Sequence, residues 1–316
     1  MGVRVVKTVS VLLATYNGAG WLREQLRTLR EQDDPGFRVL MQDDGSTDGT
    51  VSVLESVCRE DPRFACGREA GRHLGPIGNF WSLLRQDGAD YSALCDQDDL
   101  WHSDRLSRCR AVMARAEEQY GADTPLLVHS DCRLIDAEDR VLHESFFQHQ
   151  GWRPSATGLN ALLVQNNVTG CTVMLNRALR ERALACGDPK KMVMHDWFMA
   201  QTAAAFGRVI FIDAPLVDYR QHGDNVKGAS ADSLTKRGVK ALSAREKGRA
   251  RIRLTYDNAR MLRECLGDTL PEAARKTLDD YLALEKQPKP RRLIGYVRGG
   301  YLMQSPVTVA GQLFFG

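Results

Sequence analysis

Three carboxylates fall within four consecutive positions, at Asp96, Asp98 and Asp99. Carboxylates this close together repel one another, and removing them from water is costly unless a cation joins them. Oxygen ligands suit Mg²⁺ or Mn²⁺, and Mg²⁺ typically takes one or two carboxylates together with substrate phosphates. The flanking Leu100 and Trp101 are too apolar for a free surface loop. The cluster therefore predicts a divalent-metal site for a diphosphate ligand, with a solvated acidic turn as the alternative.

A second pair of carboxylates, Asp43 and Asp44, follows another short apolar run. Acids near a helix start are favoured by the helix dipole, and Ser46 or Thr47 can cap the helix that follows. This explanation suits Asp48 better than Asp43. Asp43 stands at the end of the run, where a carboxylate can accept a hydrogen bond from the imino group of a nucleotide base. We predict such a role for Asp43, with Asp44 beside it.

Small and turn-forming residues surround Thr15, Tyr16 and Asn17, which end the first apolar run and precede Gly18 and Gly20. Such residues let a backbone approach a ligand closely, and the start of the next helix favours a phosphate or a ring edge. The segment does not match G-x-G-x-x-G, so a dinucleotide site is not indicated. A ligand-binding loop and a plain strand-to-helix turn both remain open.

Two later segments carry polar residues that can act on a substrate. Asp196 lies between His195 and Trp197. A carboxylate in a partly apolar cleft can serve as a general base, and an indole can stack on a sugar. The alternative is that Asp196 caps a helix and Trp197 belongs to the core. Further on, Arg220 and His222 follow a predicted strand, and His222 is either a metal ligand or a structural residue.

Alternating strands and helices position these segments. Apolar and β-branched runs predict strands at Thr8–Ala14, Arg38–Met41, Tyr91–Cys95 and Leu126–His129. Apolar residues at helical spacing predict helices at Trp21–Gln32, Thr47–Cys58, Asn79–Leu84 and Arg105–Tyr120. The alternation favours an α/β fold, in which helices cover both faces of a parallel sheet. Ligands of such sheets bind at the carboxyl ends of the strands, which is where the acids and the Thr15 segment stand.

The second half is less regular. We expect a loop at Val141–Pro154, followed by elements at Thr157–Leu163, Cys171–Leu175, Arg177–Ala185, His195–Phe206 and Val209–Ile212. After about Gly228 the pattern becomes helical and basic through Arg263, and the tail from Lys286 to Gly316 has five basic residues and no acid. A tail that mixes cations with apolar residues can lie in a membrane interface, pack on the domain as a basic helix, or be disordered.

Composition excludes several classes of protein. The 316 residues carry a formal net charge of +3, which gives no strong field for nucleic acid. The eight Cys form no C-x-x-C pair and show no zinc-finger spacing. We find no secretory leader and therefore expect a cytoplasmic protein with reduced thiols. No apolar stretch reaches about 18 residues, so a membrane-spanning helix is not predicted.

The order of the motifs resembles the family 2 glycosyltransferases of the GT-A fold, in their rhamnosyltransferase-like branch. The resemblance covers about residues 8–228 and rests on five segments, which are Thr15 to Asn17, Asp43 to Thr50, Asp96 to Trp101, His195 to Trp197, and Tyr219 to His222 with Asn225 and Gly228. It implies a mostly parallel nucleotide-binding sheet. It also implies a nucleotide-sugar half at about 1–130, an acceptor half at about 131–228 and a mainly helical, basic extension at 229–316.

The resemblance implies a role for each matched residue. The nucleotide sugar would be bound by Thr15, Tyr16, Asn17, Asp43, Asp44, Asp96 and Gln97. Mg²⁺ or Mn²⁺ would be held by Asp98 and His222, and Asp196 would be the catalytic base. Weaker contacts with the acceptor or the donor sugar would come from Asp99, Trp101, His195, Trp197 and Arg220. Many members have Glu where this chain has His195, so the role of that residue stays open.

The implied reaction is an inverting transfer of a sugar, L-rhamnose from dTDP-rhamnose, to a glycan acceptor. Relatives often extend lipid-linked glycans, which implies a peripheral enzyme on the cytoplasmic face of the membrane in cell-surface polysaccharide or O-antigen synthesis. A UDP-hexose donor stays open. So does a sugar-nucleotide nucleotidyltransferase, although such an enzyme would want a basic loop after the first strand, and Thr15–Gly20 has no basic residue. A non-catalytic binding module would need neither a base nor an acid cluster.

Overall fold

A computed structural model of the chain describes residues 7–69, 71–185, 188–222 and 244–316. Within these ranges a nine-stranded sheet has the order β3-β2-β1-β4-β8-β6-β9-β5, and β7 pairs with β6 off this path. The first half forms strands β1 (Val9–Thr15), β2 (Phe37–Asp43), β3 (Phe64–Cys66) and β4 (Tyr91–Asp96), which pair in parallel. Its helices are α1 (Ala19–Arg30), α2 (Thr50–Glu60), α3 (Gly75–Gln86) and α4 (Arg105–Tyr120).

Helices cover both faces of this sheet because alternate strand residues point to opposite sides. Val11 and Leu13 of β1 lie in a core cluster with the buried residues of α1, α2 and α4. Leu12, between them, lies in a second cluster with the buried residues of α3. The α/β class and the eight elements predicted for the first half are confirmed. The short strands β3 and β5 (Leu100–Trp101) were not predicted, because two or three residues show no periodicity.

The second half of the sheet is mixed rather than parallel throughout. Strand β8 (Met174–Asn176) runs antiparallel to both β4 and β6 (Leu126–Ile135), while β6 and β9 (Arg208–Arg220) are parallel. Both β6 and β9 extend well beyond their predicted ends at His129 and Ile212. The extension is interrupted by register shifts near Asp131, where Pro215 lies opposite. Strands β6 and β9 thus extend the sheet beyond β8, and β9 brings Arg220 to its own end.

The loop predicted at Val141–Pro154 contains two elements, strand β7 (Val141–His143) and helix α5 (Phe146–Gln150). The hydroxyl of Ser145 accepts a hydrogen bond from the Gln148 amide and caps α5, and Phe146 and Phe147 are buried. The prediction of a loop was therefore wrong. Its aromatic residues are apolar anchors for a helix too short to show a helical period.

The chain then forms α6 (Leu159–Val164), α7 (Arg177–Leu184) and α8 (His195–Phe206), with short 3₁₀ helices at Gly170–Thr172 and Pro189–Lys191. The C-terminal region is helical, as predicted, with α9 (Ala244–Leu266), a 3₁₀ turn at Gly267–Thr269, α10 (Glu272–Leu284), α11 (Lys289–Gly299) and α12 (Pro306–Phe315). The predicted boundary at 228/229, with Asn225 and Gly228, lies outside the described residues.

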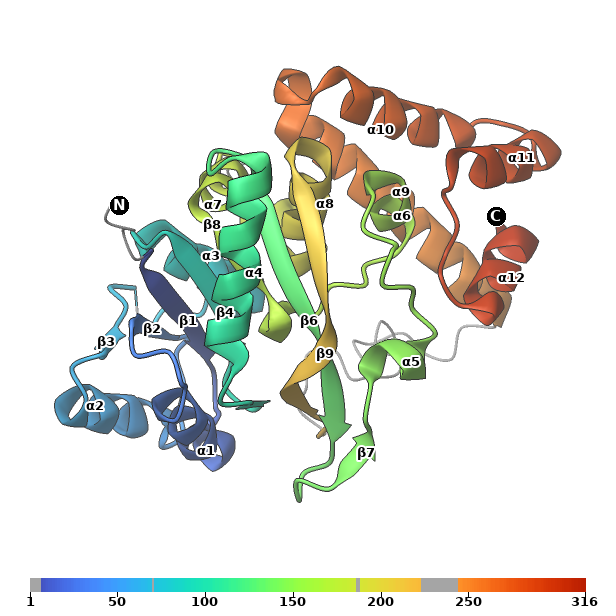
Figure 1. Cartoon of the computed structure of the whole chain (residues 1–316). Coiled ribbons are helices and arrows are strands. Elements are labelled where there is room, and N and C mark those ends of the chain that lie inside the picture. Colours follow the sequence, from blue (N-terminus) through green and yellow to red (C-terminus); the bar gives the residue numbers. More distant parts are fainter. Residues whose placement is uncertain (1–6, 70, 186–187, 223–243) are drawn as a thin grey trace.

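The C-terminal helices pack on the second half of the molecule, away from β1–β3 (Figure 1). Tyr256 of α9, Tyr281 of α10 and Tyr296 of α11 are buried in the same core cluster as Leu162 of α6 and Phe198 of α8. The tail is therefore folded against the domain, with Tyr296 buried in this cluster. Among the described residues, no helix combines the length and the apolar character that crossing a membrane requires.

Candidate active site

The carboxyl ends of β1, β2 and β4 meet at one edge of the sheet. In the strand register Thr15 lies opposite Asp43, and Ala14 lies opposite Asp96. Three of the predicted segments are thereby brought together by the sheet itself. This is the edge at which ligands of open α/β sheets bind.

Asp43 is buried at this edge and is held in a fixed orientation. Its Oδ1 accepts hydrogen bonds from the hydroxyls of Thr15 (3.0 Å) and Ser46 (2.5 Å). Its Oδ2 accepts from the backbone amides of Gly45 (3.0 Å) and Ser46 (2.7 Å). These four donors fix the orientation of the Asp43 carboxylate beside Thr15.

Asp44, the next residue, holds the start of α3. Its carboxylate accepts hydrogen bonds from the amides of Leu74 (2.5 Å) and Gly75 (2.9 Å). The imidazole of His73 lies 3.2 Å from the same carboxylate and 5.0 Å, between ring centroids, from the ring of Tyr16. No motif in the sequence marks His73, which reaches Tyr16 because the segment before α3 is bonded to Asp44.

Gln97 clasps the peptide of Tyr16 with both ends of its side-chain amide. Oε1 accepts a hydrogen bond from the Tyr16 amide (2.8 Å), and Nε2 donates to the Tyr16 carbonyl (2.9 Å). Asn17 follows in the left-handed region at φ 46°, where its own carbonyl Oδ1 accepts from the amide of Thr47. Gln97 thus ties the acid cluster to the Tyr16 loop, and the Tyr16 ring is left 46% exposed.

The acid cluster divides between a solvent-facing side and a buried side. Nε2 of His222 lies 2.8 Å from Oδ2 of Asp98, and both side chains are partly exposed. Asp99 is fully buried, and its Oδ1 accepts a hydrogen bond from the Arg220 amide at 3.2 Å. Burial raises the pKa of Asp96 to about 7, with further contributions from the charges of Asp98 and Asp196. Burial also raises the pKa of Asp99 well above its ordinary value.

Arg220 is buried and links the acid cluster to neighbouring segments. Its Nε donates to the carbonyl of Asp98 at 2.9 Å. Its Nη2 donates to Glu24 of α1 at 3.2 Å, and its Nη1 pairs with Asp139. Because these contacts engage the guanidinium with the protein, they fix the end of β9 against Asp98.

Asp196 lies in the first turn of α8, close enough to Asp96 for the charges to interact. Its Oδ1 accepts a hydrogen bond from the Trp197 amide at 2.6 Å. A Cβ placed on Gly170 would lie 3.7 Å from Oδ2 of Asp196 and 3.4 Å from Nε2 of His195. Gly170 therefore packs beside both groups, and a side chain there would come into contact with them. His195 itself is buried and stacks on the ring of Phe80.

The two tryptophans named in the sequence analysis lie in the core. Trp197 is buried and donates its indole N–H to the carbonyl of Leu162 at 2.5 Å. Trp101 is buried with the Arg105 guanidinium 3.3 Å above its ring centre. Both rings are engaged by protein atoms, so we assign neither a sugar-stacking role.

The donor set at Asp98 and His222 fits a divalent ion. The ordinary ligands of Mg²⁺ and Mn²⁺ are oxygens, with imidazole accepted by the transition metal. A second group of ligand atoms, from Asp96, Asp99 and Cys171, lies within 4.8 Å of one another. Its thiol suits softer metals, and Asp99 and Cys171 are buried. The Asp98–His222 pair is therefore the better match to an ion that also meets a diphosphate.

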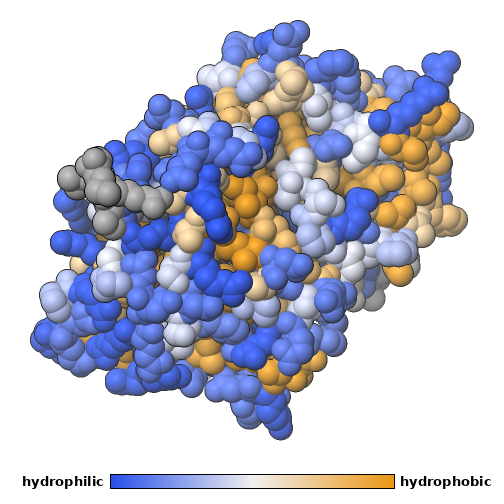
Figure 2. Space-filling model, viewed as in Figure 1, coloured by the Kyte–Doolittle hydropathy of each residue, from blue (hydrophilic) through white to orange (hydrophobic). Residues whose placement is uncertain are grey.

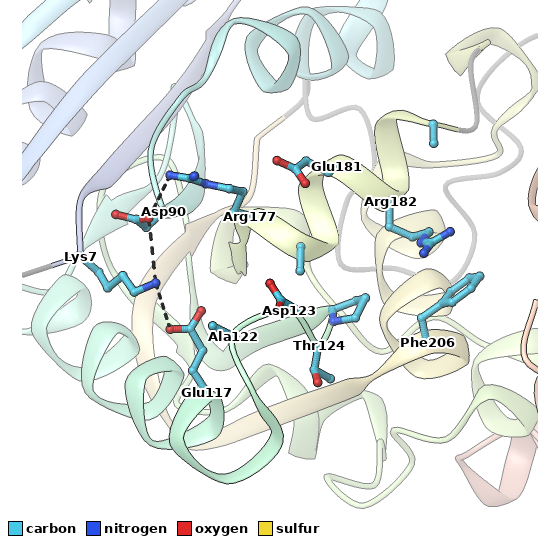
Figure 3. A pocket seen from close by; sticks show the side chains of 13 residues that line it. Lys7, Asp90, Glu117, Ala122, Asp123, Thr124, Arg177, Glu181, Arg182 and Phe206 are labelled. Atoms are coloured by element: carbon cyan, nitrogen blue, oxygen red, sulfur yellow. Dashed lines mark hydrogen bonds and ion pairs between the residues drawn. The ribbon is translucent and has the colours of Figure 1, made fainter. Parts of the chain in front are cut away.

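A hollow of about 660 Å³ lies elsewhere, beside the amino ends of β4 and β6 (Figure 3). Lys7 lies 4.0 Å from Asp90 and 3.8 Å from Glu117, and Arg177 lies 3.0 Å from Asp90. None of the predicted site residues lines it. Lys7, Asp90, Glu117 and Arg177 pair with one another within this hollow, which among the described residues holds no cluster of acids like the one at the other edge.

Comparisons with known proteins agree with this arrangement. The family described as Glycosyl transferase family 2 matches residues 10–182. Over 231 residues the chain is 26% identical to the dTDP-rhamnosyl transferase RfbG of Shigella flexneri, covering 69% of this chain and 74% of that protein.

Two solved structures share the fold. The structure of S. aureus TarS 1–349 with UDP-GlcNAc has a TM-score of 0.55 at 17% identity, covering 96% of this chain and 83% of that one. The mannosyltransferase PcManGT of Pyrobaculum calidifontis, in complex with GDP-Man and Mn²⁺, has a TM-score of 0.50 at 21% identity, covering 97% and 87%. These likenesses confirm the predicted fold class, a GT-A-like sheet with a helical C-terminal region.

Proposed function

This chain belongs to glycosyl transferase family 2, and from that premise we propose that it is an inverting, metal-dependent enzyme that transfers a sugar from a nucleoside diphosphate to a glycan. The observation that carries the proposal is the contact of Asp98 with His222 at the sheet edge where Asp43 and Asp196 also lie. In this proposal one edge would hold a carboxylate that binds the nucleotide base, a pair that binds the ion and the diphosphate, and a carboxylate that acts as the general base.

Asp196 would remove the proton from an acceptor hydroxyl. Its Oδ1 is oriented by the Trp197 amide, and its Oδ2 lies beside Gly170, which has no side chain to cover it. As the proton moves to the carboxylate, the acceptor oxygen forms a bond to the anomeric carbon from the side opposite the diphosphate. The bond from that carbon to the diphosphate oxygen breaks, and configuration inverts. A positioned base contributes about 10²- to 10⁴-fold to such a transfer.

The donor would lie along the sheet edge. Asp43 and Thr15 would contact the heterocyclic base of the nucleotide. Tyr16, Asn17, Asp44 and Gln97 would form or support the pocket around it. Asp98 and His222, with Asp96 nearby, would hold Mg²⁺ or Mn²⁺. When bound, the ion would offset the charge that develops on the leaving diphosphate. The Mn²⁺ named with PcManGT supports a divalent ion but does not choose between the two.

The donor we propose is dTDP-rhamnose, supported by the similarity to RfbG over 69% of the chain. A UDP-hexose is the alternative, supported by the UDP-GlcNAc named with TarS. A thermal-shift panel separates them, because a ligand that binds only the folded state raises the melting temperature. We expect dTDP with Mn²⁺ to stabilise the protein more than UDP with Mn²⁺. If UDP stabilised the protein more than dTDP, a UDP-hexose would replace dTDP-rhamnose as the proposed donor. If the melting temperature stayed the same with every nucleotide, the proposed activity would be contradicted.

The acceptor we propose is a glycan carried on a lipid, reached by a peripheral enzyme on the cytoplasmic face of the membrane. Support comes from α11 and α12, which expose Ile294 (52%), Val297 (59%), Val307 (82%) and Phe314 (71%). Hydrophobic residues gather over this end of the molecule, with hydrophilic ones around them (Figure 2).

Cations accompany these apolar side chains. Lys286, Lys289, Arg291 and Arg298 are exposed, and no acid occurs from Lys286 to the last residue. An anionic lipid surface attracts each such residue by about 1 kcal/mol, and exposed apolar side chains can enter the interface. The chemistry of this surface therefore favours an anionic membrane as its partner.

A further inference from the structure

The indole of Trp21 touches two residues of the late polar segment. Its ring stacks on the imidazole of His222, with centroids 5.1 Å apart and an interplanar angle of 21°. The guanidinium of Arg220 lies 4.8 Å from the centre of the same indole. Trp21 belongs to the first turn of α1, which begins directly after the Tyr16 loop. A single side chain thus connects the first motif of the chain with the last described one.

The position of the indole is itself fixed by the start of α1. The Trp21 amide donates to the Gly18 carbonyl at 3.0 Å, and the Gly18 amide donates to the hydroxyl of Thr50 at 2.9 Å. One turn further along, Glu24 accepts from Arg220. The first two turns of α1 therefore contact the residues at the end of β9 through Trp21 and Glu24.

The stacking geometry determines where the imidazole nitrogens point. The lone pairs of an imidazole lie in the ring plane, so a stacked neighbour that fixes the plane also fixes their direction. In this plane Nε2 of His222 faces Oδ2 of Asp98 at 2.8 Å. The indole therefore adds a restraint on rotation of the ring to that of the contact between Nε2 and Asp98.

We propose that Trp21 is a positioning residue that holds His222 in line with Asp98 for ion binding. The inference rests on the proposed function, in which Asp98 and His222 hold the divalent ion. Groups that orient metal ligands from behind contribute about 10- to 100-fold to metal affinity. The indole acts through its flat shape and its π face. We therefore expect Phe at position 21 to preserve this role and an aliphatic residue to lose it.

The test measures the Kd of Mn²⁺ in the presence of saturating dTDP or UDP, by electron paramagnetic resonance of the free ion. We expect Trp21→Leu to raise this Kd by about tenfold or more, and Trp21→Phe to stay within about threefold of the wild type. Nucleotide binding in excess chelator should not change in either variant. Leu26→Val is the matched control, since Leu26 is buried on the same helix. It should lower the melting temperature without changing the Kd.

A spectroscopic readout complements the Kd. The difference between the emission of the wild type and of Trp21→Phe isolates the contribution of Trp21 among the five tryptophans. We expect this difference to fall when Mn²⁺ binds, because a paramagnetic ion held by His222 would quench the emission of the indole that stacks on it. Equal Mn²⁺ affinity in the wild type and Trp21→Leu would overturn the role of Trp21 alone. If the wild type held no Mn²⁺, the proposed metal role of Asp98 would fail, and the role of Trp21 with it.

Discussion

Nε2 of His222 lies 2.8 Å from Oδ2 of Asp98, although 124 positions separate the two residues in the chain. The contact is supported from behind, since the amide and Nε of Arg220 donate to the side chain of Asp99 and the carbonyl of Asp98. The end of β9 and the end of β4 are thereby joined into one unit.

Asp196→Asn tests the assignment of the base. The side chain of Asn cannot take up the proton of the acceptor hydroxyl. It has the same size as Asp and keeps the hydrogen bond from the backbone N–H of Trp197. We expect the affinity for the donor nucleotide to stay near the wild-type value and kcat to fall by about 10²- to 10⁴-fold. Isothermal titration and a transfer assay measure the two quantities. Wild-type turnover in the variant would remove Asp196 from the mechanism.

Gly18→Ala tests the clasp of Gln97 on Tyr16. A Cβ at Gly18 would lie 2.1 Å from Oε1 of Gln97, so the added methyl must displace the amide from the Tyr16 peptide. We expect a higher KM for the donor and a lower melting temperature. In the Gln97→Ala background the methyl has room, and the effect of Gly18→Ala should shrink, giving a coupling on the order of 1–2 kcal/mol. Strictly additive effects would show that the two residues do not act together.

Asp218→Asn tests a charge network that joins β5, β6 and β9. Asp218 accepts hydrogen bonds from His102 (2.9 Å) and from Nε of Arg133 (2.6 Å). Burial alone would raise the pKa of Asp218, but these hydrogen bonds outweigh it, and the pKa lies below the ordinary value. A lowered pKa stabilises the fold above the pKa of the unfolded chain, and this contribution is lost as pH falls through the folded value.

The variant should therefore be less stable than the wild type at pH 7 by about 1–3 kcal/mol in the free energy of unfolding, measured with urea. The difference should narrow below about pH 4, where the unfolded Asp takes up its proton. A difference that stays constant from pH 7 to pH 3 would mean that packing, and not the charge of Asp218, is responsible.

Replacing Ile294, Val297 and Phe314 together by Ser tests whether α11 and α12 bind a membrane, and it leaves both helices in place. Deleting the tail would be a poorer test, because Tyr296 of α11 lies in the core. We expect the triple variant to lose sedimentation with vesicles that contain anionic lipid, and to keep transfer to a water-soluble acceptor. The matched control is Val141→Ser with Leu142→Ser, two exposed apolar residues of β7. Unchanged sedimentation of the triple variant would contradict the assignment.

The sequence predicted the parts of the fold in which one face of an element is buried. The strands that became β1, β2 and β4 were identified with their ends, so the edge that carries Thr15, Asp43 and Asp96 was located correctly. Helix α5 was missed because five residues show no period, although Phe146 and Phe147 anchor it.

The site was harder to predict, because its contacts join distant positions. Gln97 was expected beside the nucleotide, and the structure shows its amide engaged with Tyr16, 81 positions away. Trp21 is the first residue of the helix predicted at Trp21–Gln32, and no motif marks it as part of the site. Its contact with His222 depends on the register of β9 against β6, which no local pattern encodes.

The proposed activity depends on an ion that the Asp98–His222 pair would hold. The most direct measurement compares Mn²⁺ affinity and sugar transfer in the wild type and in Asp98→Ala, with dTDP-rhamnose and UDP-sugars as donors. We expect the wild type to bind one Mn²⁺ with the nucleotide and to lose activity in chelator. Asp98→Ala should bind the ion at least about tenfold more weakly and transfer sugar at a small fraction of the wild-type rate. Full-speed transfer by Asp98→Ala, or by the wild type in chelator, would contradict the account.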